Sequence, residues 1–215
     1  MRIVCISDTH NCNEQISVPD GDMLIHAGDA TIKGTDQEVI EFLHWFSELP
    51  HRYKIMIAGN HDWLFQTEAR FAKNLITDSE IVYLQDSSTN IHGLKIYGSP
   101  WQPRFYDWAF NLNRGPEMAE KWAMIPDDTD ILITHGPPHG ILDEVETKFG
   151  ASHEGCEELR KRIESLAQNG KLKLHIFGHI HSGYGVREEF GVKFVNASIC
   201  DEEYQPTQPP IVIDL

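Results

Sequence analysis

The sequence has few cysteines, few basic residues and no long hydrophobic run. Its four cysteines form no Cys-x-x-Cys pair and no dense framework, which favours reduced thiols over a disulfide scaffold or a redox site. Lysine and arginine number 18 against 33 acidic residues, giving a net charge of −15. Because a duplex-binding surface needs clustered basic residues, long nucleic acid is disfavoured as a partner. No segment approaches the roughly 18 apolar residues of a membrane-spanning helix.

The composition is that of an ordinary globular protein, with 40% hydrophobic and 24% charged residues. A chain of 215 residues fits a single domain, residues 1–215, that buries about 70% of its unfolded surface. The N-terminus enters an apolar strand-like run at once, and Asp8 follows as a candidate ligand. We therefore expect no removable signal peptide and a cytoplasmic location.

Short apolar runs alternate with amphipathic segments along the chain. We predict strands near 2–7, 23–27, 53–58, 81–84, 94–98, 131–134, 172–177, 186–190, 192–196 and 211–213. Helices are predicted near 36–47, 64–74, 117–124 and 156–168. The first helix begins with the capping-box pattern Thr35-Asp36-Gln37-Glu38. Strands interleaved with crossover helices indicate an α/β fold, and the segment 99–130, rich in proline and aromatics, separates two halves.

Five polar motifs come after predicted strands, four of them directly and the second after two residues. They are Asp8-Thr9-His10, Gly28-Asp29, Gly59-Asn60-His61-Asp62, Thr134-His135-Gly136 and Gly178-His179-Ile180-His181. Ligands bind beyond the carboxyl ends of the strands in an α/β sheet, so we expect the motifs to converge on one cleft. Imidazoles, carboxylates and an amide suit Mn, Fe, Zn, Co or Ni better than a thiolate zinc site does. The pattern predicts a two-metal site.

Each motif taken alone has an ordinary structural explanation. A single histidine after a strand is more often structural than catalytic. Asp29 alone is explained as a cap, and Asn60 alone as a turn residue that tolerates left-handed geometry. Neither explanation accounts for the ordered series, so the joint pattern favours the metal site.

The ordered set D-x-H, G-D, G-N-H-D, H-G and G-H-x-H resembles the signature of the calcineurin-like metallophosphoesterases. The match runs from residue 8 to residue 181. Within that superfamily, residues 98–110 and 134–140 resemble the small metallophosphoesterase-domain proteins (MPPED, UPF0046-like), some of which act on cyclic nucleotides. The resemblance implies two mixed β-sheets packed as a sandwich, flanked by α-helices, with a dinuclear site at the carboxyl edge of the strands.

The resemblance also implies a role for each motif residue. One metal is assigned Asp8, His10 and His181, the other Asn60, His135 and His179, and Asp29 bridges both. The implied cofactors are two divalent ions, with Mn²⁺ favoured and Fe, Zn, Co or Ni as alternatives, about 3.5–4 Å apart. A hydroxide that bridges the metals attacks phosphorus. His61 protonates the leaving oxygen as general acid, and Asp62 orients His61 and raises its pKa.

Three further residues are weaker candidates for substrate contact. His139 follows the ligand His135 by four residues, with an exposed loop as the alternative explanation. Arg104 is placed to reach a phosphate, with a surface ion pair as the alternative. Trp101 belongs to a loop whose rings suggest base stacking, although such a cluster is more often a small hydrophobic core under a loop. The rings of this loop are Trp101, Phe105, Tyr106, Trp108 and Phe110.

We therefore expect a phosphodiesterase that acts on small phosphodiesters, with cyclic nucleotides as the first candidates. One alternative is a phosphomonoesterase acting on a phosphoprotein or a nucleotide, which needs a cationic clamp for which Arg104 is the single candidate. The other alternative is a binding module that has lost catalysis. The complete ligand set and His61 argue against that module. No membrane partner is expected, and no oligomeric state is predicted.

Overall fold

The computed structural model describes residues 1–77, 79–148 and 150–215. Its first sheet runs in the order β15 (Ile211–Asp214), β1 (Arg2–Ile6), β2 (Met23–His26), β3 (Tyr53–Met56) and β4 (Ile81–Tyr83). Strands β1 to β4 are mutually parallel, and β15 pairs with β1 in the antiparallel sense. The C-terminal strand therefore closes one edge of the sheet that the N-terminal strand begins.

The second sheet is also mixed. It runs in the order β13 (Gly185–Glu189), β14 (Val192–Asn196), β12 (Leu174–Phe177), β9 (Ile131–Thr134), β6 (Leu94–Ser99) and β5 (Ser87–Ile91). The four central strands are parallel, and an antiparallel strand covers each edge. β5 and β6 form a hairpin that turns at His92 and Gly93.

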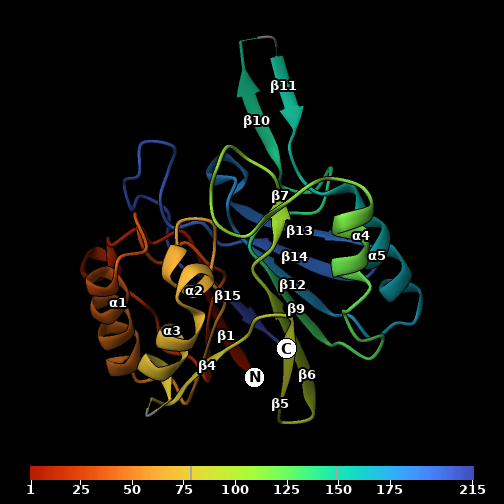
Figure 1. Cartoon of the computed structure of the whole chain (residues 1–215). Helices are drawn as coiled ribbons and strands as arrows, with labels where there is room; N and C mark the ends of the chain where they lie inside the picture. The colour runs from red at the N-terminus through yellow and green to blue at the C-terminus, as the bar shows by residue number, and fades with distance from the viewer. Residues whose placement is uncertain (78, 149) are drawn as a thin grey trace.

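Helices cover the outer face of each sheet (Figure 1). They are α1 (Asp36–Glu48), α2 (Trp63–Thr67), α3 (Ala69–Ile76), α4 (Pro116–Trp122) and α5 (Glu157–Gln168). The predicted capping box is present, since the Thr35 side chain accepts from the Glu38 amide and Glu38 accepts from the Thr35 amide. The single helix predicted over 64–74 is wrong: Glu68, at φ −126° and ψ 44°, separates α2 from α3.

The two-residue period of the strands produces three hydrophobic layers. Ile3 and Ile25 face inward and pack with Ile133 and Ile176 of the second sheet. The alternate residues of the first sheet pack outward on α1, α2 and α3, while the outer face of the second sheet packs on α4 and α5. The predicted sandwich of two mixed sheets flanked by helices is confirmed.

Two small pairings lie outside the main sheets and were not predicted. β7 (Gln102–Pro103) pairs with β8 (Asn111–Leu112), and β10 (Glu144–Thr147) pairs with β11 (Gly150–His153) as a ribbon that projects from the body (Figure 1). The ribbon is mostly exposed and contains one large apolar residue, Val145, within its described strands. It therefore lacks the alternating apolar pattern on which a strand prediction depends.

Parallel strands from both sheets end at the same side of the molecule. The five motifs follow β1, β2, β3, β9 and β12. The short 3₁₀ helix η1 (Asn13–Gln15) follows the first motif, and η2 (His181–Gly183) begins at the final residue of the last motif. In the described part of the chain, no helix is both long and apolar enough to cross a membrane.

Candidate metal centre

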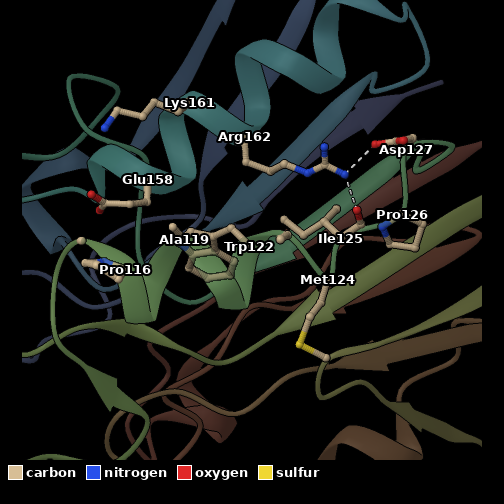
Figure 2. A pocket seen from close by; sticks show the side chains of 12 residues that line it. Pro116, Ala119, Trp122, Met124, Ile125, Pro126, Asp127, Glu158, Lys161 and Arg162 are labelled. Atoms are coloured by element: carbon tan, nitrogen blue, oxygen red, sulfur yellow. Dashed lines mark hydrogen bonds and ion pairs between the residues drawn. The ribbon is translucent and has the colours of Figure 1, made fainter.

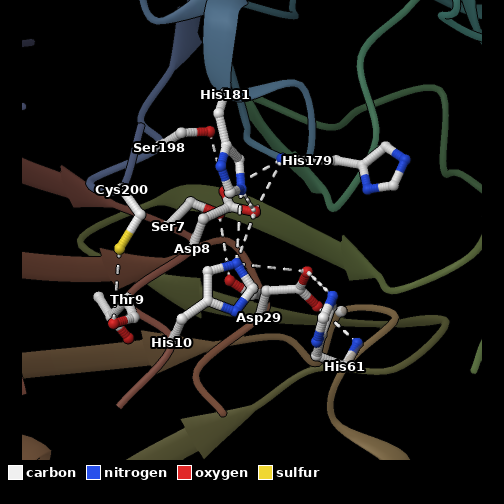
Figure 3. Close-up of polar contacts among 12 residues, drawn as sticks. Ser7, Asp8, Thr9, His10, Asp29, His61, His179, His181, Ser198 and Cys200 are labelled. Atoms are coloured by element: carbon white, nitrogen blue, oxygen red, sulfur yellow. Dashed lines mark hydrogen bonds and ion pairs between the residues drawn. The ribbon is translucent and has the colours of Figure 1, made fainter. Parts of the chain in front are cut away.

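The candidate ligands converge at the carboxyl ends of strands from both sheets. Figure 3 shows Asp8, His10, Asp29 and His181 gathered there. Three overlapping groups have donor atoms within 4.8 Å of one another: Asp8, His10 and His181; His10, Asp29 and His61; Asp29, His135 and His179. Because His10 and Asp29 each belong to two groups, the three groups form one connected cluster.

The Asp29 carboxylate lies at the centre of this cluster. Its Oδ2 is 3.3 Å from Nε2 of His135, 3.9 Å from Nε2 of His10 and 4.0 Å from Nε2 of His61. Its Oδ1 accepts a 2.8 Å hydrogen bond from the His61 amide. On the far side, Asn60 Oδ1 lies 2.9 Å from the same His135 Nε2. Asp29 therefore lies between the two ligand sets that the family resemblance assigns to different metals.

Four of the imidazoles are held in the same orientation. In each, Nδ1 lies within hydrogen-bond distance of a backbone carbonyl, so Nδ1 carries a proton and Nε2 faces the cluster. The carbonyls belong to Thr31 for His10 (3.1 Å), Ile32 for His61 (2.7 Å), Ala27 for His135 (3.0 Å) and Asp201 for His181 (2.7 Å). The rings are thus set by the backbone before any ligand binds.

Four candidate ligands adopt left-handed backbone, at φ 51° for Asp8, 41° for His10, 55° for Asp29 and 69° for His179. Such residues cost roughly 1–3 kcal/mol each and persist where the surroundings fix them. Here the Asp8 amide donates to Gly28 O at 2.9 Å, and the His10 amide donates to Asp29 O at 3.2 Å. The turns that aim these ligands thus carry backbone strain that the surrounding hydrogen bonds hold in place.

Gly178 is required by close approach rather than by its φ. A Cβ at this position would lie 1.9 Å from Asp8 Oδ2. The next residue, His179, donates its amide to both oxygens of Asp8, at 3.1 and 3.0 Å. A side chain at Gly178 would therefore displace the Asp8 carboxylate, which belongs to the first motif and accepts from the His179 amide of the last motif.

Carboxylates and imidazoles in the cluster shift each other's pKa in opposite directions. Burial alone would raise the pKa of Asp8 and Asp29, but His181 and His135 respectively outweigh it and lower both. Burial alone would lower the pKa of His135 and His181, but Asp29 and Asp8 raise each to about 9. The pKa of His179 falls to about 3, mainly by burial. The protein alone therefore holds protons at His135 and His181 near neutral pH.

Those two protons predict a pH-dependent metal affinity. A cation must displace them, so binding releases protons and tightens as pH rises toward 9, by about tenfold per pH unit for each proton displaced. Protonation of His135 and His181 also stabilises the folded, metal-free chain, because their folded-state pKa values exceed the unfolded value of 6.5. This stabilisation is fully present below pH 6.5 and is lost as pH rises through 9. Thermal unfolding of chelated and Mn²⁺-loaded protein across pH 6.5–9 should show a widening gap between the two transition temperatures. A constant gap would contradict the assignment of these imidazoles.

The donor set fits a pair of borderline divalent cations. It comprises imidazole nitrogens, carboxylate oxygens and one amide oxygen, and the described clusters contain no cysteine. Cys200 lies beside the site, but its Sγ donates to Thr9 O at 3.8 Å (Figure 3). Such a set suits Mn, Fe, Zn, Co or Ni.

Comparison with known proteins agrees with this geometry. The family model described as calcineurin-like phosphoesterase matches residues 1–183. The chain belongs to this family. Human metallophosphoesterase domain-containing protein 1 is 46% identical over 237 residues, covering 100% of this chain and 71% of that protein. UPF0046 protein K07C11.7 of Caenorhabditis elegans is 39% identical over 224 residues, covering 99% and 74%.

Solved structures share the fold at low identity. TT1561 of Thermus thermophilus superposes with a TM-score of 0.59 and 16% identity, covering 91% of this chain and 88% of that one. That likeness shows the fold alone. Family membership makes this calcineurin-like phosphoesterase a phosphoester hydrolase of a class that binds divalent metals.

The expected pairing of Asp62 with His61 is not present in this phosphoesterase. The Asp62 carboxylate accepts from the amides of Ala30 (3.3 Å), Thr31 (3.0 Å) and Gly59 (2.8 Å), and from the Thr31 hydroxyl at 2.7 Å. Its oxygens are thus committed to the turns that carry Asp29 and Asn60. A backbone carbonyl, that of Ile32, orients His61 instead.

A cleft of about 480 Å³ opens over the cluster. Its lining includes Asp29, Asn60, His61, His179 and His181 from the motifs, Pro103, Arg104, Phe105 and Arg114 from the middle segment, Val145 and Glu154 from the ribbon region, and Tyr204 from the C-terminal loop. The cleft thus combines the candidate ligands with two arginines and two aromatic rings. Arg104, which was predicted to contact substrate, is among the residues that line the cleft.

The other two predicted substrate contacts, Trp101 and His139, lie outside the lining of this cleft. Trp101 is packed against the hydrophobic core, where its Nε1 donates to Asp86 Oδ2 at 2.9 Å. His139 has its ring 5.6 Å from that of His153, at the base of the ribbon. Neither Trp101 nor His139 is among the residues that line the cleft.

A hollow of about 750 Å³ lies between α4 and α5, away from the metal cluster (Figure 2). Trp122, Ala119 and Ile125 form its apolar part, and Arg162 on its rim donates to the Ile125 carbonyl and, at 2.7 Å, to Asp127. It contains none of the motif residues. The chemistry of this phosphoesterase therefore belongs to the smaller cleft.

Tyr204 and Ser198 are site residues that the sequence did not indicate. The Tyr204 ring centroid lies 4.7 Å from that of His10 and 5.5 Å from that of His181. The Ser198 hydroxyl donates to Asp8 Oδ2 at 2.9 Å. Both belong to the segment after β14, and no motif in that segment distinguishes them from ordinary loop residues.

Proposed function

We propose that the chain is a dinuclear metal-dependent phosphodiesterase for small phosphodiesters, with cyclic nucleotides as the first candidate substrates. The observation that carries the proposal is the position of Asp29. Its Oδ2 lies within 4.0 Å of imidazole nitrogens from three different motifs. A carboxylate placed between two donor sets is what a two-metal hydrolase requires.

The residues present divide naturally into two binding sets. Asp8, His10 and His181 would hold one ion, Asn60, His135 and His179 would hold the other, and Asp29 would touch both. When bound, divalent cations would supply Lewis acidity, which activates water for attack on phosphorus and neutralises charge on the phosphoryl oxygens. Mn²⁺ as the native ion and a cytoplasmic location stay predictions.

His61 is the proposed general acid. Its Nδ1–H donates to Ile32 O, which leaves Nε2 as the atom that faces the cleft, and its ring stacks on Trp108 with centroids 4.2 Å apart. Nε2 is therefore the atom from which a proton can pass to the leaving oxygen. Asp62 supports this chemistry as a positioning residue, because it fixes the turns that carry Asp29 and Asn60.

The charges of the cleft favour a diester over a monoester. A phosphodiester carries one negative charge, whereas a monoester carries close to two near neutral pH. Among the described lining residues, the side chains of lysine or arginine are Arg104 and Arg114. Arg114 is already committed to Glu157 and to the carbonyls of Gly155 and Glu154. Arg104 bonds to Asn113 through Nε at 3.3 Å and would serve as the single side-chain clamp.

Two exposed rings support a planar group on the substrate. Phe105 is 50% exposed and Tyr204 is 44% exposed, and both line the cleft. The Phe105 ring lies 5.9 Å from that of His179, whereas Tyr204 lies against His10. Stacking of a base on such a ring contributes roughly 1–3 kcal/mol. Together with the resemblance to enzymes that act on cyclic nucleotides, these rings make such diesters the first substrates to test.

The test compares bis-p-nitrophenyl phosphate with p-nitrophenyl phosphate after chelation and reloading with Mn²⁺. We expect faster, metal-dependent cleavage of the diester, followed by cleavage of 2′,3′- or 3′,5′-cyclic nucleotides in a screen. A higher kcat/KM for the monoester would overturn the phosphodiesterase proposal in favour of a phosphatase. Two bound metals without cleavage of either ester or of any cyclic nucleotide would favour the binding module.

A further inference from the structure

Two buried histidines, His26 and His175, are outside the candidate ligand set. Each is fully buried within the packed face of a sheet, among aromatic rings. The ring of His26 lies 4.9 Å from that of Phe42, and the ring of His175 lies 4.8 Å from that of Phe177. Burying an apolar side chain at either place would cost less free energy than burying an imidazole, so the polar nitrogens need an explanation.

The hydrogen bonds of His26 have one self-consistent direction. The Gly28 amide donates to Nδ1 at 3.2 Å, so the imidazole proton is on Nε2. Nε2–H then donates to the Thr9 hydroxyl, 3.0 Å away, and that hydroxyl donates to Ala30 O at 3.4 Å. His26 thus connects Thr9, which lies between Asp8 and His10, to Gly28 and Ala30 on either side of Asp29.

His175 repeats this arrangement in the second sheet. The Thr134 hydroxyl donates to Gly136 O at 2.8 Å, so it accepts from His175 Nε2–H, which is also 2.8 Å away. The other nitrogen, Nδ1, has no hydrogen-bond partner within the described part of the chain. The buried ring therefore leaves Nδ1 without a hydrogen bond while Nε2 bonds to Thr134, which directly precedes His135.

The repetition follows from equivalent topology. Each threonine directly precedes a candidate ligand histidine at the end of a strand, and each partner histidine stands on the parallel neighbouring strand: β2 beside β1, and β12 beside β9. Burial lowers the pKa of both His26 and His175 to about 3, so both rings are neutral at working pH. In each neutral ring the single N–H lies on Nε2, where the threonine hydroxyl accepts it.

We propose that His26 and His175 are positioning residues of the metal centre, each fixing through a threonine hydroxyl a turn that carries a ligand. The inference rests on the proposed two-metal site and assigns a different ligand-bearing turn to each histidine. His26 acts on the turns of Asp8, His10 and Asp29, whereas His175 acts on the turn of His135. Loss of a partner bonded directly to a metal ligand costs about 10- to 100-fold in metal affinity, and we expect loss of His26 or His175, which act through a threonine, to fall within that range.

The test titrates Mn²⁺ into chelated protein by calorimetry and compares His175→Phe with His175→Gln. We expect His175→Phe to weaken one binding event by about 10- to 100-fold, and His175→Gln, which can keep a donor near Nε2, to restore most of it. Phe194→Leu is the matched control, because it disturbs a neighbouring ring, 5.8 Å from His175, and should leave the affinity unchanged. His26→Phe should weaken binding of Mn²⁺ at the set of Asp8, His10 and His181.

A double variant separates positioning from general packing. If His175 acts through the hydroxyl, His175→Phe combined with Thr134→Val should bind Mn²⁺ no more weakly than the worse single variant. Additive losses, or wild-type affinity in His175→Phe and His26→Phe with only a lower unfolding temperature of the chelated chain, would overturn the inference. Failure of the wild-type chain itself to bind Mn²⁺ would instead overturn the proposed function.

Discussion

Asp29→Asn is expected to abolish turnover and to weaken binding of both metal ions. The substitution keeps the shape of the side chain and an oxygen for the 2.8 Å bond from the His61 amide, but removes the charge between the two ligand sets. Loss of one preorganised electrostatic contact costs roughly 10²–10³ in turnover, and here the lost group is assigned to both ions. Calorimetric titration with Mn²⁺ and the rate with bis-p-nitrophenyl phosphate measure the two effects.

Asp143→Asn is the matched control for this experiment. Asp143 is also fully buried, but it accepts from Gly140, Gly155 and His153 at the base of the ribbon, away from the candidate ligands. We expect this variant to keep its metals and its turnover even if its unfolding temperature falls. Loss of one ion alone from Asp29→Asn, with the other bound at wild-type affinity, would contradict a bridging role.

His61→Ala is expected to keep metal binding and lose turnover by roughly 10²–10⁴-fold on substrates with alkoxide leaving groups. The reason is that an alkoxide needs a proton at neutral pH, and Nε2 of His61 is the donor assigned to it. With bis-p-nitrophenyl phosphate the loss should be much smaller, since p-nitrophenolate leaves without protonation. The contrast between the two substrates distinguishes an acid from a ligand, whose removal would slow both equally.

A histidine outside the cleft provides the control for His61. His139→Ala removes an imidazole at the base of the ribbon and should leave the kcat on both substrates unchanged. Because His61 also belongs to one of the three donor groups, metal content must be measured in the same samples. An equal rate loss on both substrates together with loss of an ion would make His61 a ligand and refute the acid role.

The fold and the convergence of the motifs were predictable because they depend on local pattern. Apolar runs such as Ile131–Thr134 are long enough to identify buried strands, and a polar motif after a strand in an α/β sheet has a defined edge to occupy. The order of the motifs then supplied the family. Motifs of this kind can be recognised in the sequence without knowing which strand lies beside which.

Features that depend on the path of loops were not predictable. Asp62 is next to His61 in sequence, yet the turn after Asp29 brings two amides and a hydroxyl to the Asp62 carboxylate, and Gly59 adds a third amide. These bonds determine its role. Trp101 shares a loop with Phe105, but one ring packs inward and the other lines the cleft. In both cases the deciding contact joins residues that are distant in sequence or lie on a loop without periodicity.

The most direct test of the two-metal account is a titration of chelated protein with Mn²⁺, following bound metal and diester hydrolysis together. The account predicts two ions bound per chain and turnover that rises chiefly with the second ion, since the nucleophile and the phosphoryl group need both. Saturation at one ion with full turnover, or hydrolysis that persists in excess chelator, would contradict it.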